Sequence, residues 1–215
     1  MNETIDGTII LLHAAVVDYR SLAIYGRRLA KLGFMVHNLG YQNRELNVFD
    51  CAESLLAAFK NRANKSNRPI HLIGHSMGGL VARRLVYLHR PENLGGIVTL
   101  GTPHLGSPLA DLLHKYKFYQ KLFGPAGQDL VTGRPIDWVA PWPPPCPIGL
   151  IAGGLPVGPG SLNLPRPHDG TVTKASAQPD GGTDYATVPA THTTLHLLKR
   201  TARLSARFLR TGRFS

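Results

Sequence analysis

Acidic residues and cysteines are scarce in this sequence, and each shortage excludes a class of protein. The 215 residues include 13 Asp and Glu against 24 Lys and Arg, a formal net charge of +11. Such a balance first suggests a negatively charged partner, either a nucleic acid or an anionic surface. The two cysteines, Cys51 and Cys146, are too few for a disulfide framework or a zinc knuckle. Because 43% of the residues are hydrophobic and only 17% are charged, a disordered chain is also excluded.

Long apolar runs are absent as well. None approaches the roughly 18–20 residues of a transmembrane helix. The apolar run nearest the start, Thr8–Val17, is interrupted by His13, and Asn2, Glu3 and Asp6 stand before it in place of a cationic leader. We therefore expect a cytoplasmic protein. Peripheral association with a membrane surface is compatible with this expectation.

Short apolar runs alternate with stretches of helical period, which predicts a single α/β domain over residues 1–215. We expect strands at Thr8–His13, Phe34–Leu39, Ile70–Ile73, Leu94–Leu100, Ile148–Ala152 and Tyr185–Val188. We expect helices at Tyr19–Leu32, from Asp50 or Cys51 to Phe59, at Met77–Leu88 and at His192–Arg210, the last ended by Gly212. This alternation predicts a mostly parallel central sheet of about six strands with helices on both faces.

The stretch 105–147 does not follow this rhythm. It contains both tryptophans, Trp138 and Trp142, and a run of three prolines at 143–145. Helical spacing is shown by Leu109, Leu112, Leu113, Tyr116 and Phe123, which predicts an amphipathic helix. That helix either packs on the core or forms a lid that presents apolar surface to an acyl chain. We expect the whole stretch to be a lid-like insertion.

The most specific motif is Gly74-His75-Ser76-Met77-Gly78, a match to the pattern G-x-S-x-G. It stands directly after a predicted strand and directly before a predicted helix. A tight turn at this place holds the serine in a strained conformation at the positive end of the helix, and small flanking residues allow the backbone to pass closely. The motif predicts that Ser76 is a nucleophile.

A serine hydroxyl becomes a strong nucleophile only when a histidine takes its proton and a carboxylate orients that histidine. In this kind of motif the partners follow in the order serine, acid, histidine. His192 follows the last predicted strand and is the preferred base, with His196, one helical turn later, as the alternative. For the acid we expect Asp169, with Asp180 as the runner-up, because each precedes a glycine and can occupy a tight turn.

At this point the sequence resembles the small serine esterases and lipases of the α/β-hydrolase fold. The resemblance covers nearly the whole chain and rests on five segments: Ile10–Ala15, similar to the L-L-H-G turn; Gly74–Gly79, the lipase-type elbow; Val98–Ser107, with its T-P-H-x-G-S turn; His168–Val172, similar to the D-G-x-V acid loop; and Pro189–His192, the histidine loop. Larger members have antiparallel strands before the first of these segments. The resemblance therefore implies a minimal α/β-hydrolase fold.

The resemblance also implies roles for individual residues. Ser76 is the nucleophile, His192 the base and Asp169 the orienting acid, with no cofactor or metal. The oxyanion hole is formed by the backbone N–H groups of Met77 and Ala15. Position 14 is alanine where the family usually has glycine, so Ala14 is an alternative second donor and the shape of the turn departs from the pattern.

These features predict a carboxylic ester hydrolase that works through an acyl-enzyme on a small-molecule or lipid ester. The alternatives are acyl transfer or thioester hydrolysis on the same triad, and a non-catalytic binding module that uses a basic C-terminal helix. Four arginines, Arg200, Arg203, Arg207 and Arg210, lie within one arc of that helix. We expect this arc to be solvated or attracted to anionic lipid. No nucleic-acid recognition motif is present, so no nucleic-acid partner is expected.

Overall fold

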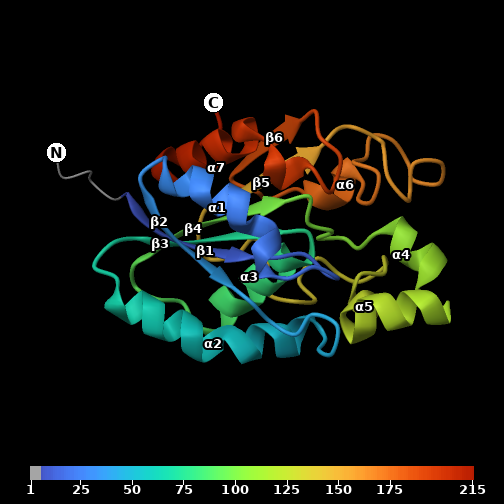
Figure 1. Ribbon diagram of the computed structural model, residues 1–215, viewed down its shortest axis with the longest axis horizontal. Helices are drawn as coiled ribbons and strands as arrows, with labels where there is room; N and C mark the ends of the chain where they lie inside the picture. Colours follow the sequence, from blue (N-terminus) through green and yellow to red (C-terminus); the bar gives the residue numbers. More distant parts are fainter. Residues whose placement is uncertain (1–5) are drawn as a thin grey trace.

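The computed structural model describes residues 6–215, and its centre is a six-stranded sheet (Figure 1). The strands run in the spatial order β2-β1-β3-β4-β5-β6, and every neighbouring pair is parallel. Their bounds are β1 Gly7–Leu12, β2 Phe34–Leu39, β3 Ile70–His75, β4 Leu94–Leu100, β5 Ile148–Gly153 and β6 Asp184–Val188. The predicted α/β fold with a six-stranded parallel sheet is confirmed.

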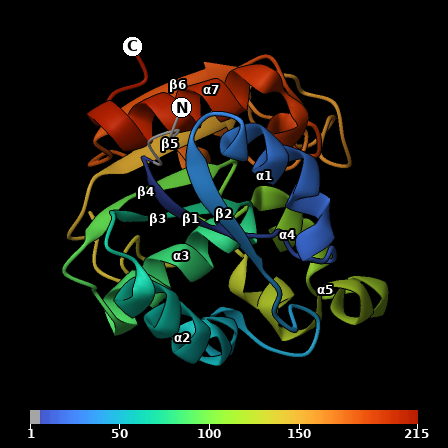
Figure 2. The ribbon, with the colours of Figure 1, turned by 60° about the vertical axis from the view of Figure 1, so that its left-hand side comes forward.

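Helices cover both faces of the sheet, which explains why the inner strands are apolar throughout their length. Figure 2 shows α1 (Ala23–Ala30) and α7 (Lys199–Thr211) together on one side, with α2 (Val48–Lys65) and α3 (Met77–Leu88) on the other. Alternate residues of β1 enter two separate cores. Ile10 and Leu12 pack with the α2–α3 side, and Ile9 and Leu11 pack with the α1–α7 side.

Several predicted helix boundaries are wrong. The first helical stretch is a 3-10 turn, η1 (Tyr19–Leu22), followed by α1, because the Asp18 carboxylate caps the turn by accepting the Arg20 N–H. The second helix begins earlier than expected because the Asn47 side chain caps it, and it continues to Lys65.

The last helix also differs from its predicted extent. It begins at Lys199 and not at His192, which lies in the preceding loop, ahead of a short 3-10 turn, η2 (Leu195–Leu197). At its other end Gly212 adopts a left-handed conformation (φ 73°). This is the predicted C-terminal cap.

The insertion is not built around one amphipathic helix as expected. It contains α4 (Pro108–Leu113) and α5 (Lys117–Asp129), separated by a turn in which Tyr116 is extended. Gly124 (φ 59°) then kinks α5 just before Pro125. The remaining residues, 130–147, form a coil against the α2–α3 side of the core, where Val139 and Ala140 are buried. A short helix that the sequence pattern did not predict, α6 (Lys174–Ala177), precedes β6.

The cationic arc predicted on the last helix is present, with one exception. Arg200, Arg203 and Arg207 are exposed, but Arg210 forms an ion pair with Asp6 at 2.5 Å and lies over the ring of Phe34. Within residues 6–215, every helix is too short or too polar to cross a membrane.

Candidate active site

The predicted site residues converge on one edge of the sheet. Because all strands are parallel, the loops that follow them meet at their carboxyl ends, where ligands bind in open α/β sheets. Ser76 follows β3, Asp169 lies between β5 and β6, His192 follows β6 and Ala15 follows β1. Residues far apart in the chain are thereby brought to a common place.

Ser76 occupies the sharp turn between β3 and α3. Its backbone is at φ 53° and ψ −125°, and Val16 is the only other non-glycine residue with positive φ in the part of the chain that the structure describes. The turn is held by two hydrogen bonds at 2.8 Å, from Ser76 N–H to the Leu100 carbonyl and from the Thr102 hydroxyl to the Ser76 carbonyl. The strained conformation predicted from the motif is therefore observed, at the first turn of α3.

The glycines of the elbow permit contacts that any side chain would prevent. A Cβ atom on Gly74 would lie 2.3 Å from the backbone carbon of Gly78. A Cβ on Gly78 would lie 2.2 Å from the carbonyl oxygen of Leu12 in β1. Both distances are far below a van der Waals contact, so β3, α3 and β1 can meet at this point only because these residues are glycines.

Asp169 and His192 form a buried pair. The His192 Nδ1 lies 2.8 Å from the Asp169 Oδ2, and the two backbones are joined by a second bond from His192 N–H to the Asp169 carbonyl at 2.8 Å. The other carboxylate oxygen, Oδ1, accepts the N–H groups of Thr171 and Val172 at 3.0 and 2.7 Å. The carboxylate is thus fixed on both sides, and the ring of His192 is fixed by the carboxylate.

The two alternatives from the sequence lie elsewhere. The Asp180 side chain is exposed, and its backbone carbonyl accepts the indole N–H of Trp142 at 2.6 Å. His196 is buried, with its ring 4.7 Å from that of His75, and its Nδ1 has no partner among the described residues. Burial and the nearby His192 lower the pKa of His196. The structure therefore pairs His192 with Asp169.

The turn after β1 is held from outside by side chains of the β2–α2 loop. Asn43 donates from Nδ2 to the carbonyls of Ala14 and Val17 at 2.9 and 2.7 Å. The Tyr41 hydroxyl donates to the carbonyl of His13, and the Tyr41 ring stacks on the His13 ring with centroids 4.1 Å apart. The carbonyls of the turn are therefore occupied, and their peptide planes are fixed.

This arrangement explains how alanine replaces the usual glycine. The residue with positive φ is Val16 (φ 71°) and not Ala14, so a side chain at position 14 causes no backbone strain. The N–H of Ala15 has no protein acceptor within the described residues, and the N–H of Met77, at the first position of α3, has no acceptor within its helix. Both predicted oxyanion donors are thus free to bind a ligand.

The T-P-H-x-G-S motif was recognisable in the sequence, but the contacts that its residues make between these loops were not. Ser107 donates to the Thr171 carbonyl beside the acid at 2.7 Å, and His104 lies 3.2 Å from the Thr99 hydroxyl. The T-P-H-x-G-S turn therefore joins the elbow to the acid loop, and its motif was the available signal. Asn43 stands in no motif, and nothing local in the sequence indicated it.

Arg83 is a second residue that the sequence did not indicate. Its side chain is fully buried on α3 and donates to the carbonyls of Ile136 and Ala140 at 2.7 and 2.8 Å, with the Trp142 ring 4.7 Å away. Burial lowers the pKa of Arg83 to about 10. This guanidinium fastens the coil of the insertion to α3.

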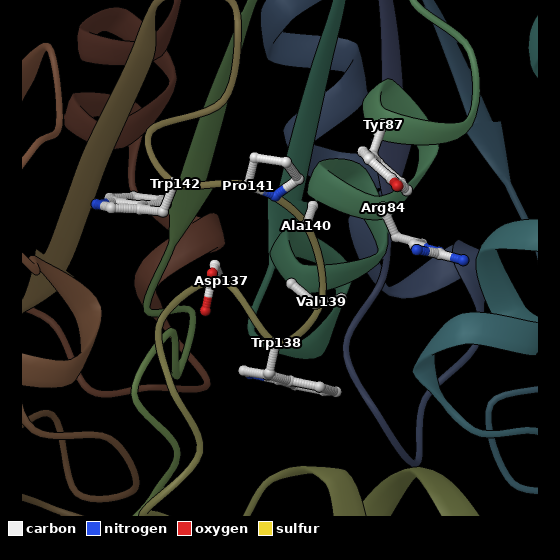
Figure 3. Close-up of a pocket in the computed structure, with 8 residues that line it drawn as sticks. All are labelled: Arg84, Tyr87, Asp137, Trp138, Val139, Ala140, Pro141 and Trp142. Carbon is white, nitrogen blue, oxygen red and sulfur yellow. The ribbon is translucent and has the colours of Figure 1, made fainter.

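Figure 3 shows a pocket lined by this coil and by α3. Its volume is about 430 Å³, and none of the predicted site residues is among its lining residues. Its lining includes Arg84, Tyr87 and Trp138. In the described residues no group of three His, Cys, Asp or Glu side chains is placed to hold a metal ion. Within the described residues, this edge of the sheet carries a serine, a histidine–carboxylate pair and free backbone N–H groups.

Comparison with known proteins agrees with this architecture. The lipase BlEst2 of Bacillus licheniformis, in its mature form, superposes with a TM-score of 0.71 at 20% identity over 89% of this chain and 87% of its own. The GPI inositol-deacylase of Xenopus laevis is 32% identical over 100 residues, and the triacylglycerol lipase of Pseudarthrobacter phenanthrenivorans is 40% identical over 62. These two matches cover 46% and 28% of this chain, but only 9% and 19% of the relatives' own lengths.

The family model described as the PGAP1-like alpha/beta domain matches residues 10–125, more than half of the chain. The match includes the turn after β1, the elbow, the T-P-H-x-G-S turn and α4, and it ends within α5. The resemblance to lipase-like α/β hydrolases is confirmed at the level of the family and of the fold. The chain belongs to the PGAP1-like alpha/beta domain family.

Proposed function

We propose that the protein hydrolyses carboxylic esters through an acyl-enzyme on Ser76, with His192 as the base and Asp169 as the orienting acid. The observation that supports this most directly is the buried 2.8 Å contact between His192 and Asp169, at the same sheet edge as the strained Ser76. A histidine held by a carboxylate has a fixed tautomer and orientation, as a base for a serine hydroxyl requires.

In the acylation step, the Ser76 oxygen attacks the ester carbonyl carbon while His192 Nε2 takes the hydroxyl proton. The resulting tetrahedral oxyanion accepts hydrogen bonds from the N–H groups of Met77 and Ala15. His192 then gives its proton to the leaving alkoxide, which departs as an alcohol. Asp169 stays ionised and stabilises the imidazolium that forms in between.

In the deacylation step, His192 removes a proton from a water molecule, which attacks the acyl carbonyl. The second tetrahedral intermediate uses the same two N–H groups. Its collapse releases the carboxylic acid and returns the proton to Ser76. Loss of one such donor costs about 10²–10³ in turnover in comparable sites, so the fixed turn after β1 is central to the proposal.

A lipid ester is the substrate class that we propose. Relatives of this chain are named triacylglycerol lipase and GPI inositol-deacylase, both hydrolases whose names specify lipid substrates. Acyl transfer uses the same acyl-enzyme with an alcohol in place of water, and product analysis with an added alcohol distinguishes it. Thioester hydrolysis is distinguished by offering an oxoester and a thioester of the same acyl group.

Ser76→Ala tests the proposal. We expect it to abolish turnover of a short-chain chromogenic ester and covalent labelling by a fluorophosphonate probe. Ser54→Ala is a matched control, because Ser54 lies on α2 and its hydroxyl donates to the Cys51 carbonyl of the same helix. Labelling that persists in Ser76→Ala would contradict the assignment, and a wild-type protein that neither reacts nor turns over would favour a binding module.

A further inference from the structure

Four large apolar side chains are exposed at the junction of α4 and α5, in a segment that we call the α4–α5 tip (residues 112–122). Their exposed fractions are 46% for Leu112, 49% for Tyr116, 61% for Phe118 and 42% for Leu122. The rings of Tyr116 and Phe118 are stacked, with centroids 5.9 Å apart. Isolated exposed apolar residues are normal, but a cluster of this kind indicates an interaction surface.

The same segment is cationic. Lys115, Lys117 and Lys121 are all exposed and alternate with the apolar residues. Asp111 stands just before the tip. Its two carboxylate oxygens accept hydrogen bonds from the N–H and the hydroxyl of Thr132, at 2.8 and 2.6 Å. Residues 112–122 themselves contain no Asp or Glu, so the tip combines apolar and positively charged groups without an acidic residue of its own.

Helix geometry divides the surface of α5 into three rows of side chains: one that faces the core, one that is apolar and exposed, and one of lysines. Before the kink at Gly124, one face of the helix packs on the core, where Tyr119 is buried and Phe123 is partly buried. Phe118 and Leu122 form a second row, and Lys117 and Lys121 form a third, rotated by about 100° from the second. An apolar row flanked by lysines is the pattern of a helix that lies at a membrane surface.

The tip is located on the active-site side of the molecule. It follows β4 at the carboxyl edge of the sheet, the edge that carries Ser76. The loop between β5 and α6 leaves the same edge and exposes Val157 and Leu162. Figure 1 shows α4, α5 and this loop at the same end of the molecule.

The basic face of α7 lacks the apolar component. Its apolar side chains Ala202, Ala206 and Phe208 are buried, and Arg210 is neutralised by Asp6. The exposed arginines of α7 therefore offer charge alone. The two surfaces are distinct. Both carry a similar positive charge, but of the two only the α4–α5 tip also exposes aromatic residues.

We propose that the α4–α5 tip binds membranes that contain anionic lipids. Phe118, Leu122 and Tyr116 enter the boundary between headgroups and acyl chains, and the lysines contact lipid phosphates. A second copy of this chain is a poor occupant, because its own net charge is +11. Nucleic acid is less well matched, because bases stack on Tyr116 and Phe118 but leave the aliphatic Leu112 and Leu122 without a partner.

Vesicle binding tests this inference without relying on catalysis. In a Ser76→Ala background, sedimentation is compared for vesicles of phosphatidylcholine alone and of phosphatidylcholine with phosphatidylglycerol. We expect binding to the anionic vesicles, and a loss of at least about tenfold in affinity for Phe118→Ser/Leu122→Ser and for Lys117→Glu/Lys121→Glu. Circular dichroism establishes that each variant is folded.

Matched controls identify the surface. Arg203→Glu/Arg207→Glu makes the same change of charge on α7, and Tyr87→Ser removes an exposed aromatic side chain from α3. Both should retain most of the binding. The proposal would be overturned by any of three results. The α7 variant could lose as much binding as the α5 variants, the α5 variants could bind vesicles as well as the parent protein, or the α5 variants could change oligonucleotide binding alone. A failure of the Ser76 assignment would leave these binding results unchanged.

Discussion

The imidazole of His75, the residue just before the serine, donates from Nε2 to the backbone carbonyl of His192 at 3.0 Å. Burial lowers the pKa of His75 well below its ordinary value, and the neighbouring His192 and His196 act in the same direction. The ring is therefore neutral, with its proton on the nitrogen that faces the carbonyl. The elbow thus holds not only Ser76 but also the loop that carries the proposed base.

The first prediction concerns this hydrogen bond. His75→Leu removes the donor and should lower kcat about tenfold, the equivalent of about 1.4 kcal/mol, with little change in KM. His75→Gln retains an N–H donor and should recover most of the activity. Steady-state kinetics on a soluble ester measures both variants. Equal activity of His75→Leu and wild type would show that the bond does not position His192.

The second prediction separates the two Asp-Gly candidates. Asp169→Asn should reduce kcat by about 10³–10⁴, because the neutral amide neither fixes the tautomer of His192 nor stabilises its charged form. Asp180→Asn is the matched control and should be close to wild type, since the Asp180 side chain is exposed. A large loss in the Asp180 variant alone would reverse the assignment of the acid.

The third prediction concerns the turn after β1. Asn43→Ala removes the donor shared by the Ala14 and Val17 carbonyls, so the N–H of Ala15 should be less well oriented. We expect kcat to fall by about 10–100-fold with KM nearly unchanged, the signature of an interaction made mainly in the transition state.

Arg44→Ala is the control for Asn43→Ala. It removes a single exposed hydrogen bond to the Val16 carbonyl, which water can replace, so its effect should be much smaller. A rise in KM with unchanged kcat in the Asn43 variant would argue against a role in orienting the oxyanion donor.

The fourth prediction concerns close packing at the elbow. Gly78→Ala places a methyl group 2.2 Å from the Leu12 carbonyl oxygen, so α3 must move away from β1. We expect a loss of at least about 2 kcal/mol in the free energy of unfolding. Gly154→Ala, whose new Cβ would lie 3.3 Å from the nearest atom, should change it by less than about 0.5 kcal/mol. Chemical denaturation of both variants checks the difference.

The fifth prediction concerns acid stability. Burial lowers the pKa of His71 from 6.5 to about 4, so between these values the unfolded chain binds a proton that the folded chain does not. Stability contributed by neutral His71 is complete above pH 6.5 and is lost as the pH falls towards 4. The loss amounts to about 1.4 kcal/mol per pH unit, or about 3 kcal/mol in all.

His71→Phe removes this titration while keeping a planar ring between Gly7 and Gly95. Urea denaturation at several pH values should show a slope smaller by about one proton in this window. Buried His75 and His104, whose pKa values are also lowered, leave a residual slope of the same sign. An unchanged slope in His71→Phe would contradict the prediction.

Much of the fold was predictable because its determinants are local. Inner strands of a doubly covered parallel sheet are continuous apolar runs, so β1 and β3 stand out in the sequence. The elbow is a local motif, because its glycines and Ser76 fall within five residues. The end of α7 is also local, since Gly212 supplies the left-handed conformation of the cap.

The insertion shows where periodicity fails. Leu109 and Leu113 share a helical spacing with Phe123, but Tyr116 is extended and divides the segment into two helices. The spacing of apolar residues does not reveal such a break, because a turn of the right length leaves the helical spacing the same on both sides. The predicted single helix was therefore wrong, although both parts are helical.

The sequence by itself determined the α/β class, the position of the elbow and the set of polar residues available to it. Only the tertiary structure decided which of them meet. Asp169 and Asp180 both precede glycine, but Asp169 alone lies against His192, 23 residues further along the chain. Asn43 reaches a turn 29 residues before it, and Arg83 reaches a coil 57 residues after it. Such contacts depend on how segments that are distant in the sequence meet in the folded chain, and no short-range sequence pattern indicates which of them meet.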